Sequence, residues 1–209
     1  MRGLLALSRA IDACTTFIGK SASWMILVAV LVSAINAIVR KVFNYSSNGW
    51  LELQWYLYGI AYMGAAAWTL NLNEHIRIDL LYTRASRRVQ HWIDLLGHLL
   101  FLIPFAWLLV YYLYPWFLSA YRTGETSPNA SGLILWPARL ILLLGFVLLF
   151  IQGISEIIKK IAVITGAIPD PNPHVPQHEA TLAEAEELAR EMRDNLPPEQ
   201  AASAQESRK

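Results

Sequence analysis

Two things are scarce in this chain: cysteine and charge. Cys14 is the only cysteine among 209 residues, which excludes an internal disulfide, and one thiol cannot hold a metal by itself. Charged residues make up 16% of the chain and hydrophobic residues 55%, which is far from the composition of a soluble domain. Charged residues are rarest in four long apolar stretches. The interpretation of the sequence therefore starts from these stretches.

The four stretches cover residues 21–39, 53–73, 95–121 and 133–155. A hydrocarbon core about 30 Å thick needs about 20 apolar residues in a helix, and each stretch meets or approaches that length. We therefore predict an all-α integral membrane protein whose four transmembrane helices form one domain, residues 21–165.

Ionisable groups at membrane depth are also scarce, although proton relays and ion sites usually depend on them. Only Arg139 and His98 come close. We expect Arg139 to snorkel to the membrane interface and His98 to bond a neighbouring helix. The chain by itself is therefore not expected to carry a transport site.

The lysines and arginines next to the spans predict the orientation. Nine flank the spans on one side of the membrane and four on the other. This excess places both termini in the cytoplasm, with loops 40–52 and 122–132 outside and loop 74–94 inside.

Two segments at the expected inner surface have the period of an amphipathic helix. Within residues 1–20 the apolar positions are Leu4, Leu7, Ile11, Cys14 and Ile18. In the inner loop they are Val89, Trp92, Ile93 and Leu96. We predict that an N-terminal helix and a loop helix lie in the membrane interface.

The composition changes after residue 165. Residues 1–166 carry 13 basic and 7 acidic side chains, a net +6, whereas residues 167–209 carry 4 and 9, a net −5. We predict that residues 166–209 form a Pro-rich linker and an acidic, largely disordered cytoplasmic tail with one short helix. The basic residues lie at helix ends rather than in one stripe, so no nucleic acid partner is expected.

Small and polar residues mark candidate packing faces on the first two spans. Small residues every fourth position let helix backbones approach closely. On the first span they are Ala29, Ser33 and Ala37, with Asn36 and Arg40 on nearly the same side, and on the second they are Ala61, Ala65 and Thr69, with Gly64 beside them. These faces serve either packing within the chain or contact with a partner, and the sequence leaves both open.

The densest polar sequence brackets the second span, with NGWLELQW at 48–55 before it and NEHIRID at 73–79 after it. Taken in order, Arg40, Phe43, Asn44, Trp50, Glu52, the small run at 64–66 and NEHIRIDLLY at 73–82 resemble the small membrane subunit of TRAP (tripartite ATP-independent periplasmic) transporters, often called DctQ-like. The resemblance covers about residues 20–165. One departure is visible, since many members carry two adjacent acidic residues after the Trp where this chain has only Glu52.

The resemblance implies a multi-pass protein of the bacterial inner membrane and part of a secondary transporter. The large TRAP membrane subunit would hold the substrate and sodium sites for symport of an organic acid, and a periplasmic solute-binding protein would deliver the substrate. The small subunit would form a heterodimer with the large one as scaffold and anchor among membrane lipids, with no cofactor. The hypothetical partner interface comprises Ala29, Ser33, Asn36, Arg40, Trp50, Glu52, Gly64, His75, Arg77 and Asp79, in which Arg40 and Glu52 pair with each other or with partner charges.

Other functions are open but less favoured. A haem-binding anchor subunit of an electron-transfer complex needs two histidines at matching depth on facing helices, and only His98 lies within a span. A self-sufficient exporter needs an embedded acid or a broken helix that lines a cavity. An enzyme is least expected, since the sequence has no Ser/His/Asp cluster, metal-ligand spacing or Gly-rich phosphate loop.

Overall fold

The computed structural model describes residues 1–45, 47–73, 86–169 and 188. The elements are α1 (Arg2–Phe43), α2 (Asn48–Asn71), α4 (Arg87–Gly97), the π-helical segment η1 (His98–Leu102), α5 (Ile103–Thr123) and α6 (Trp136–Ile164). Within these described ranges, β structure is limited to one bridge between Thr126 and Ile134. The all-helical class is therefore confirmed. The chain divides into residues 1–168 and the remainder. The predicted acidic tail from residue 170 onward, apart from Leu188, lies outside the described residues.

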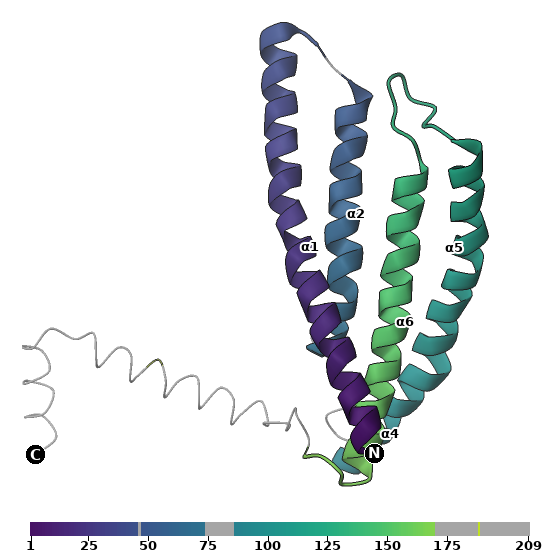
Figure 1. Ribbon diagram of the computed structural model, residues 1–209. Helices are drawn as coiled ribbons and strands as arrows, with labels where there is room; N and C mark the ends of the chain where they lie inside the picture. Colours follow the sequence, from purple (N-terminus) through teal and green to yellow (C-terminus); the bar gives the residue numbers. More distant parts are fainter. Residues whose placement is uncertain (46, 74–85, 170–187, 189–209) are drawn as a thin grey trace, which may run out of the picture. The chain divides into compact units, whose positions relative to one another are not determined.

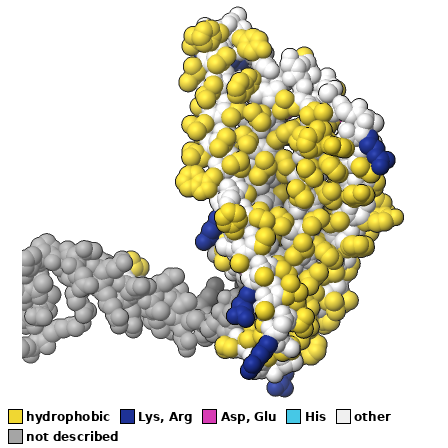
Figure 2. Space-filling model, viewed as in Figure 1, with side chains coloured by type: hydrophobic (Ala, Val, Ile, Leu, Met, Phe, Trp, Pro, Cys, Tyr) yellow, Lys and Arg dark blue, Asp and Glu magenta, His cyan; other side chains and the backbone are white. Residues whose placement is uncertain are grey.

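The long helices form two hairpins that lie side by side. α1 pairs with α2, α5 pairs with α6, and α2 and α6 meet in the middle (Figure 1). The N-terminal half of α1 also crosses onto α6. Because this arrangement is shallow, few side chains are enclosed, and large apolar side chains cover most of the face in Figure 2. Lysine and arginine gather mainly toward one end of that face.

Three helical segments of the described chain are long and apolar enough to cross a membrane: α1, the continuous run Arg87–Thr123, and α6. They contain the first, third and most of the fourth predicted span. The second predicted span coincides largely with α2, whose 24 residues extend about 36 Å. α2 does not reach the same apolarity, since Trp, Tyr, Gly and Ala make up much of it.

The predicted interfacial helices are not separate elements. No helix boundary falls near residue 20: α1 runs on to Phe43 and ends where Asn44 takes a left-handed conformation, φ 52°. Likewise α4 continues through η1 into α5. The π-helical turns directly precede Pro104, which has no N–H to donate and whose ring crowds the preceding turn. Pro104 therefore changes the helical geometry locally without ending the span.

Close contact between α1 and α2 comes from small residues. A Cβ atom built on Gly64 would lie 2.5 Å from the Cβ of Ala22, and one built on Gly19 would lie 2.5 Å from the Cβ of Trp68. Ala29 on α1 and Ala67 on α2 are fully buried. These small side chains bring the two backbones together, which fixes the C-terminal end of α2 beside the N-terminal half of α1.

Amphipathicity is inverted at this end of the molecule. Ser8 and Thr15 of α1 are buried, whereas Leu4 and Leu7 are about half exposed. α4 behaves in the same way, with Gln90 and Asp94 buried and with four half-exposed apolar side chains, Val89, Trp92, Ile93 and Leu96. Apolar groups outside and polar groups inside suit surroundings of lipid better than water. The helices thus enclose a polar core.

Candidate functional site

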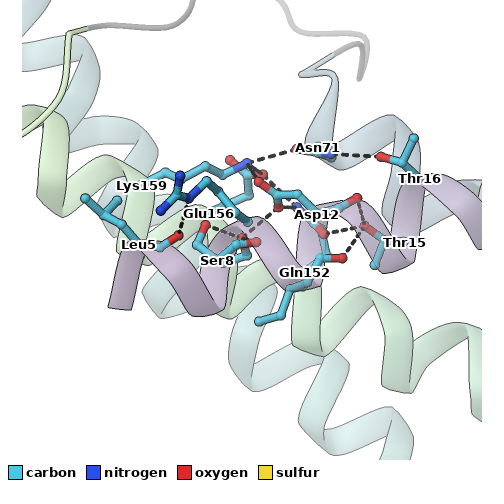
Figure 3. A network of polar contacts seen from close by, with 12 residues as sticks. Leu5, Ser8, Asp12, Thr15, Thr16, Asn71, Gln152, Glu156 and Lys159 are labelled. Atoms are coloured by element: carbon cyan, nitrogen blue, oxygen red, sulfur yellow. Dashed lines mark hydrogen bonds and ion pairs between the residues drawn. The ribbon is translucent and has the colours of Figure 1, made fainter. Parts of the chain in front are cut away.

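The polar core joins the N-terminal half of α1 to the C-terminal half of α6. On α1, Ser8, Asp12 and Thr15 share one face because they are spaced by four and three residues. On α6 the same spacing aligns Gln152, Ser155, Glu156 and Lys159. Figure 3 shows the labelled members of this set turned toward one another across the contact between the helices: Ser8, Asp12, Thr15, Gln152, Glu156 and Lys159.

Gln152 lies at the centre of this core and is fully buried. Its Nε2 donates to Asp12 Oδ1 at 2.8 Å and to Glu156 Oε1 at 2.9 Å. Its Oε1 accepts from the Thr15 hydroxyl at 2.8 Å. One amide therefore orients two carboxylates from different helices.

Lys159 supplies the positive charge between those carboxylates. Its Nζ lies 3.2 Å from Asp12 Oδ2 and 2.5 Å from Glu156 Oε1. It also donates to Asn71 Oδ1 at 2.9 Å, which brings in the end of α2. Two acidic groups thus share a single ammonium, and each of the three side chains is at most about a fifth exposed.

Two serines continue the network toward the N-terminus. The hydroxyls of Ser8 and Ser155 lie 2.7 Å apart. Ser155 also donates to Asp12 Oδ1 at 2.8 Å. Both serines are almost completely buried. The two serines therefore extend the hydrogen-bond network along the contact between α1 and α6.

A second ion pair ties α6 to α4. Lys160 Nζ lies 2.6 Å from Asp94 Oδ2, next to the Asp12 cluster along α6. His98 is buried, and its Nδ1 lies 2.6 Å from the backbone oxygen of Asp94. The prediction that His98 bonds a neighbouring helix is therefore wrong for Nδ1, whose partner lies one turn earlier in the same helical run.

The polar groups of this core bind one another. Its acceptors and donors are paired with one another, and the described residues contain no group of three or more His, Cys, Asp or Glu arranged to hold a metal ion. Pairing of this kind fixes the positions of α1, α2, α4 and α6 where their backbones converge. We interpret the core as a structural element that sets the shape of this end of the protein, and we call it the polar lock. It comprises Ser8, Asp12 and Thr15 of α1, Asn71 of α2, and Gln152, Ser155, Glu156 and Lys159 of α6.

A second polar contact lies at the opposite end, where Glu52 in the first turns of α2 holds the loop between α5 and α6. Its Oε1 accepts from the Ser127 hydroxyl at 2.5 Å and from Asn129 Nδ2 at 2.8 Å, and its Oε2 accepts from the Leu133 N–H at 2.6 Å. These hydrogen bonds, that from Ser127 first, lower the pKa of Glu52 from its ordinary value of 4.5. Arg40 is not among these partners, so the structure does not form the Arg40–Glu52 pair considered from the sequence.

Arg139 is buried in this upper part of the protein rather than snorkelling to the interface as predicted. Its guanidinium pairs with Glu125 at 2.7 Å, donates to the Trp116 carbonyl at 3.1 Å, and lies 4.3 Å from the Trp116 ring centroid. Only 8% of the residue is exposed. The carboxylate, the carbonyl and the aromatic face replace the water that snorkelling would have provided.

We predict that Glu52→Gln loosens the 124–135 loop. Gln retains one acceptor, but its amide N–H₂ would face the donating Leu133 N–H. Backbone hydrogen exchange in this loop, corrected for intrinsic rates, should rise several-fold at pH 7. Because the folded pKa of Glu52 is lowered, its contribution is present above pH 4.5 and is lost as the pH falls through the lowered value. The wild type should therefore approach the variant in acid, and equal exchange at pH 7 would contradict the role of Glu52.

The structure divides the predicted interface residues into three groups. Ala29 is fully buried against the rest of the chain and Gly64 is packed against Ala22, so both serve packing within the chain. Ser33, Arg40 and Trp50 are exposed, whereas Asn36 and Glu52 are partly buried. The remaining three predicted residues, His75, Arg77 and Asp79, lie outside the described residues.

Sequence reasoning missed the polar lock itself. Asp12 was not singled out, and Gln152 and Ser155 fell at the end of the predicted apolar span 133–155. The available signal was the matching four-and-three spacing of polar residues on two helices. That spacing shows which side chains share a face but does not reveal that the two faces meet.

Comparison with known families gives a match over most of the chain. Residues 29–163 match the model of the family described as "Tripartite ATP-independent periplasmic transporters, DctQ component", which is more than half of the 209 residues. Comparison with curated proteins and with solved structures gave no significant match. The matched segment includes the α6 half of the polar lock but begins after Ser8, Asp12 and Thr15.

Proposed function

The chain belongs to the DctQ component family of TRAP transporters, and from this premise we propose that it is a scaffold and anchor for the large transport subunit. In this proposal the large subunit carries the substrate and sodium sites, and a periplasmic solute-binding protein delivers an organic acid. The family is one of transporter components rather than enzymes.

The observation that carries the scaffold role is how the buried polar groups are used. Gln152, Glu156 and Lys159 bond to α1 and α2 and to one another. A substrate site needs polar groups that exchange protein partners for a ligand, whereas these groups fix helices in place. A rigid component of this kind suits the stationary side of a transporter whose other part moves.

The membrane topology is part of the same proposal. We propose α2 as the fourth span, since it lies between α1 and α6 and about 36 Å of helix is enough to cross a core of about 30 Å. The distribution of nine against four basic residues supports cytoplasmic termini in the bacterial inner membrane. The polar lock would then lie toward the cytoplasm and the Glu52 contact toward the periplasm.

The haem alternative receives no support. The family match is to a transport component, and within the described residues His98 is engaged through Nδ1 with its own helical run. A Soret band in the purified protein would reopen that alternative.

A mild-detergent pull-down from native membranes, with a tag on this chain, tests the function. We expect a stoichiometric partner with about a dozen predicted spans, consistent with a transport subunit and a shared membrane interface. Purification of the intact chain alone, across several mild detergents, would contradict the scaffold role.

The same pull-down tests the part of the predicted interface that is exposed. Ser33→Trp places a bulky ring on the exposed small-residue face of α1 and should lower recovery of the large subunit about ten-fold, as loss of a well-packed contact does. Ile35→Trp is the matched control, because Ile35 is half exposed and points to the opposite side of α1. Equal recovery with both variants would remove Ser33 from the interface.

A further inference from the structure

A groove of about 690 Å³ lies between α5 and α6. Its walls are apolar and aromatic and include Trp107, Tyr111, Tyr114 and Pro115 of α5 with Leu144 and Val147 of α6. Its volume is in the range of about 300–1,000 Å³ typical of small-molecule sites. The two helices belong to segments long and apolar enough to cross a membrane, so the groove opens where lipid is available.

Arg122 places a positive charge on α5 beyond the Pro115 end of this groove, seven residues or about 10 Å farther along the helix. It lies in the last turn of α5 and is exposed. Tyr111, Pro115 and Arg122 are spaced by four and seven residues, which puts all three on one face of the helix. An occupant of the groove could therefore extend toward the guanidinium along a single helix face.

Among the described residues of the α5–α6 loop and its flanking helix turns, Arg122 is a cation that forms no ion pair. Arg139 is buried and paired with Glu125 at 2.7 Å, so these two charges largely satisfy each other. Within the described part of the chain no ion pair is formed by Arg122. The mouth of the groove therefore favours an anionic group.

The length of this face matches one half of a bilayer. From Tyr111 to Arg122 the helix rises by eleven steps of 1.5 Å, about 16 Å, whereas half of a hydrocarbon core of about 30 Å is about 15 Å. A phosphate at Arg122 and an acyl chain beside Tyr111 would thus occupy their normal depths in a single leaflet.

We propose that the α5–α6 groove binds one anionic phospholipid, with an acyl chain between the helices and its phosphate on Arg122. The proposal requires insertion in a membrane but not the presence of a partner subunit. It assigns the lipid to the leaflet on the side of the α5–α6 loop.

Native mass spectrometry of the full chain, with any copurifying subunit retained, tests the proposal with phosphatidylglycerol and phosphatidylcholine of identical acyl chains. We expect phosphatidylglycerol to bind at least about five-fold more tightly, the ratio that corresponds to about 1 kcal/mol for one basic residue near the membrane surface. Arg122→Gln should remove this preference. Lys41→Gln, at the corresponding end of α1, is the matched control and should retain it.

A second variant tests the groove itself. Leu144→Trp fills the space between α5 and α6 and should reduce binding of both lipids, whereas Arg122→Gln should affect only the anionic one. Equal binding of the two lipids by the wild type, or equal effects of the Arg122 and Lys41 changes, would overturn the proposal. The proposal would also be overturned if the Leu144→Trp protein no longer copurified with the large subunit but still bound lipid normally. In that case the groove would be a contact site for the large subunit.

Discussion

Replacing Lys159 with Met should cost the protein about 3–5 kcal/mol of stability, the range found when one partner of a buried ion pair is removed. The reason is that Asp12 and Glu156 both use this ammonium. Without it, two carboxylates remain close together in a mostly buried seam. For a chain of this size the thermal midpoint in detergent should fall by about 6–20 °C.

The control and the rescue separate the shared charge from a general loss of lysine. Lys41→Met changes an exposed lysine at the other end of α1 and should leave the midpoint almost unchanged. Adding Asp12→Asn and Glu156→Gln to Lys159→Met removes the uncompensated charges and should recover most of the loss, since the amides can still hydrogen-bond. If the Lys159 and Lys41 variants melt alike, the polar lock does not stabilise the fold.

A cross-link reports on the geometry of the same seam. The hydroxyls of Ser8 and Ser155 lie 2.7 Å apart, so cysteines at both positions, in a Cys14→Ser background, should form a disulfide under mild oxidation. Lys159→Met should slow that reaction if it lets α1 move away from α6. An unchanged rate combined with a lower melting point would mean that the lock stabilises the helices without setting their positions.

The sequence predicted the helices far better than it predicted their interior. Helical length and apolarity follow from composition, so residues 21–39 fall within α1 and residues 95–121 within the run from α4 to α5. The span count depends on α2, whose aromatic and small residues make it less apolar than the other three, and it stays a prediction.

The environments of these polar side chains were not predicted, for one reason. Periodicity shows which residues share a helix face but does not show whether protein, lipid or water covers that face. Asp12 was not singled out and Arg139 was assigned to the interface, yet each has protein partners more than 20 residues away in sequence or across a loop. In lipid the usual rule of apolar inside and polar outside also loses its force. Half-exposed Leu7 and buried Ser8 follow from that reversal.

For Gly64 the difference is reversed. The sequence analysis placed it at the interface with a partner, whereas in the structure it packs against Ala22 within the chain. Gly64→Ala should destabilise the protein by about 1–3 kcal/mol, the usual cost of overpacking a close contact. The new Cβ would lie 2.5 Å from the Cβ of Ala22. Neither atom can rotate away because each is fixed to its backbone, so α1 and α2 must separate. The loss should appear as a lower thermal midpoint in detergent.

Two variants make the result specific to this contact. Gly59→Ala, on the same helix, meets its nearest neighbour, the Ile141 Cγ2, at 3.6 Å, which is an ordinary contact. It should be neutral or stabilising, since Ala is the better helix former. Ala22→Gly combined with Gly64→Ala moves the methyl group from α1 to α2 and should recover the loss except for the modest cost of Gly in a helix. Overpacking within the α1–α2 hairpin would destabilise the chain whether or not a partner is bound. If Gly64→Ala instead lowers recovery of the large subunit and leaves the thermal midpoint unchanged, Gly64 contacts the partner.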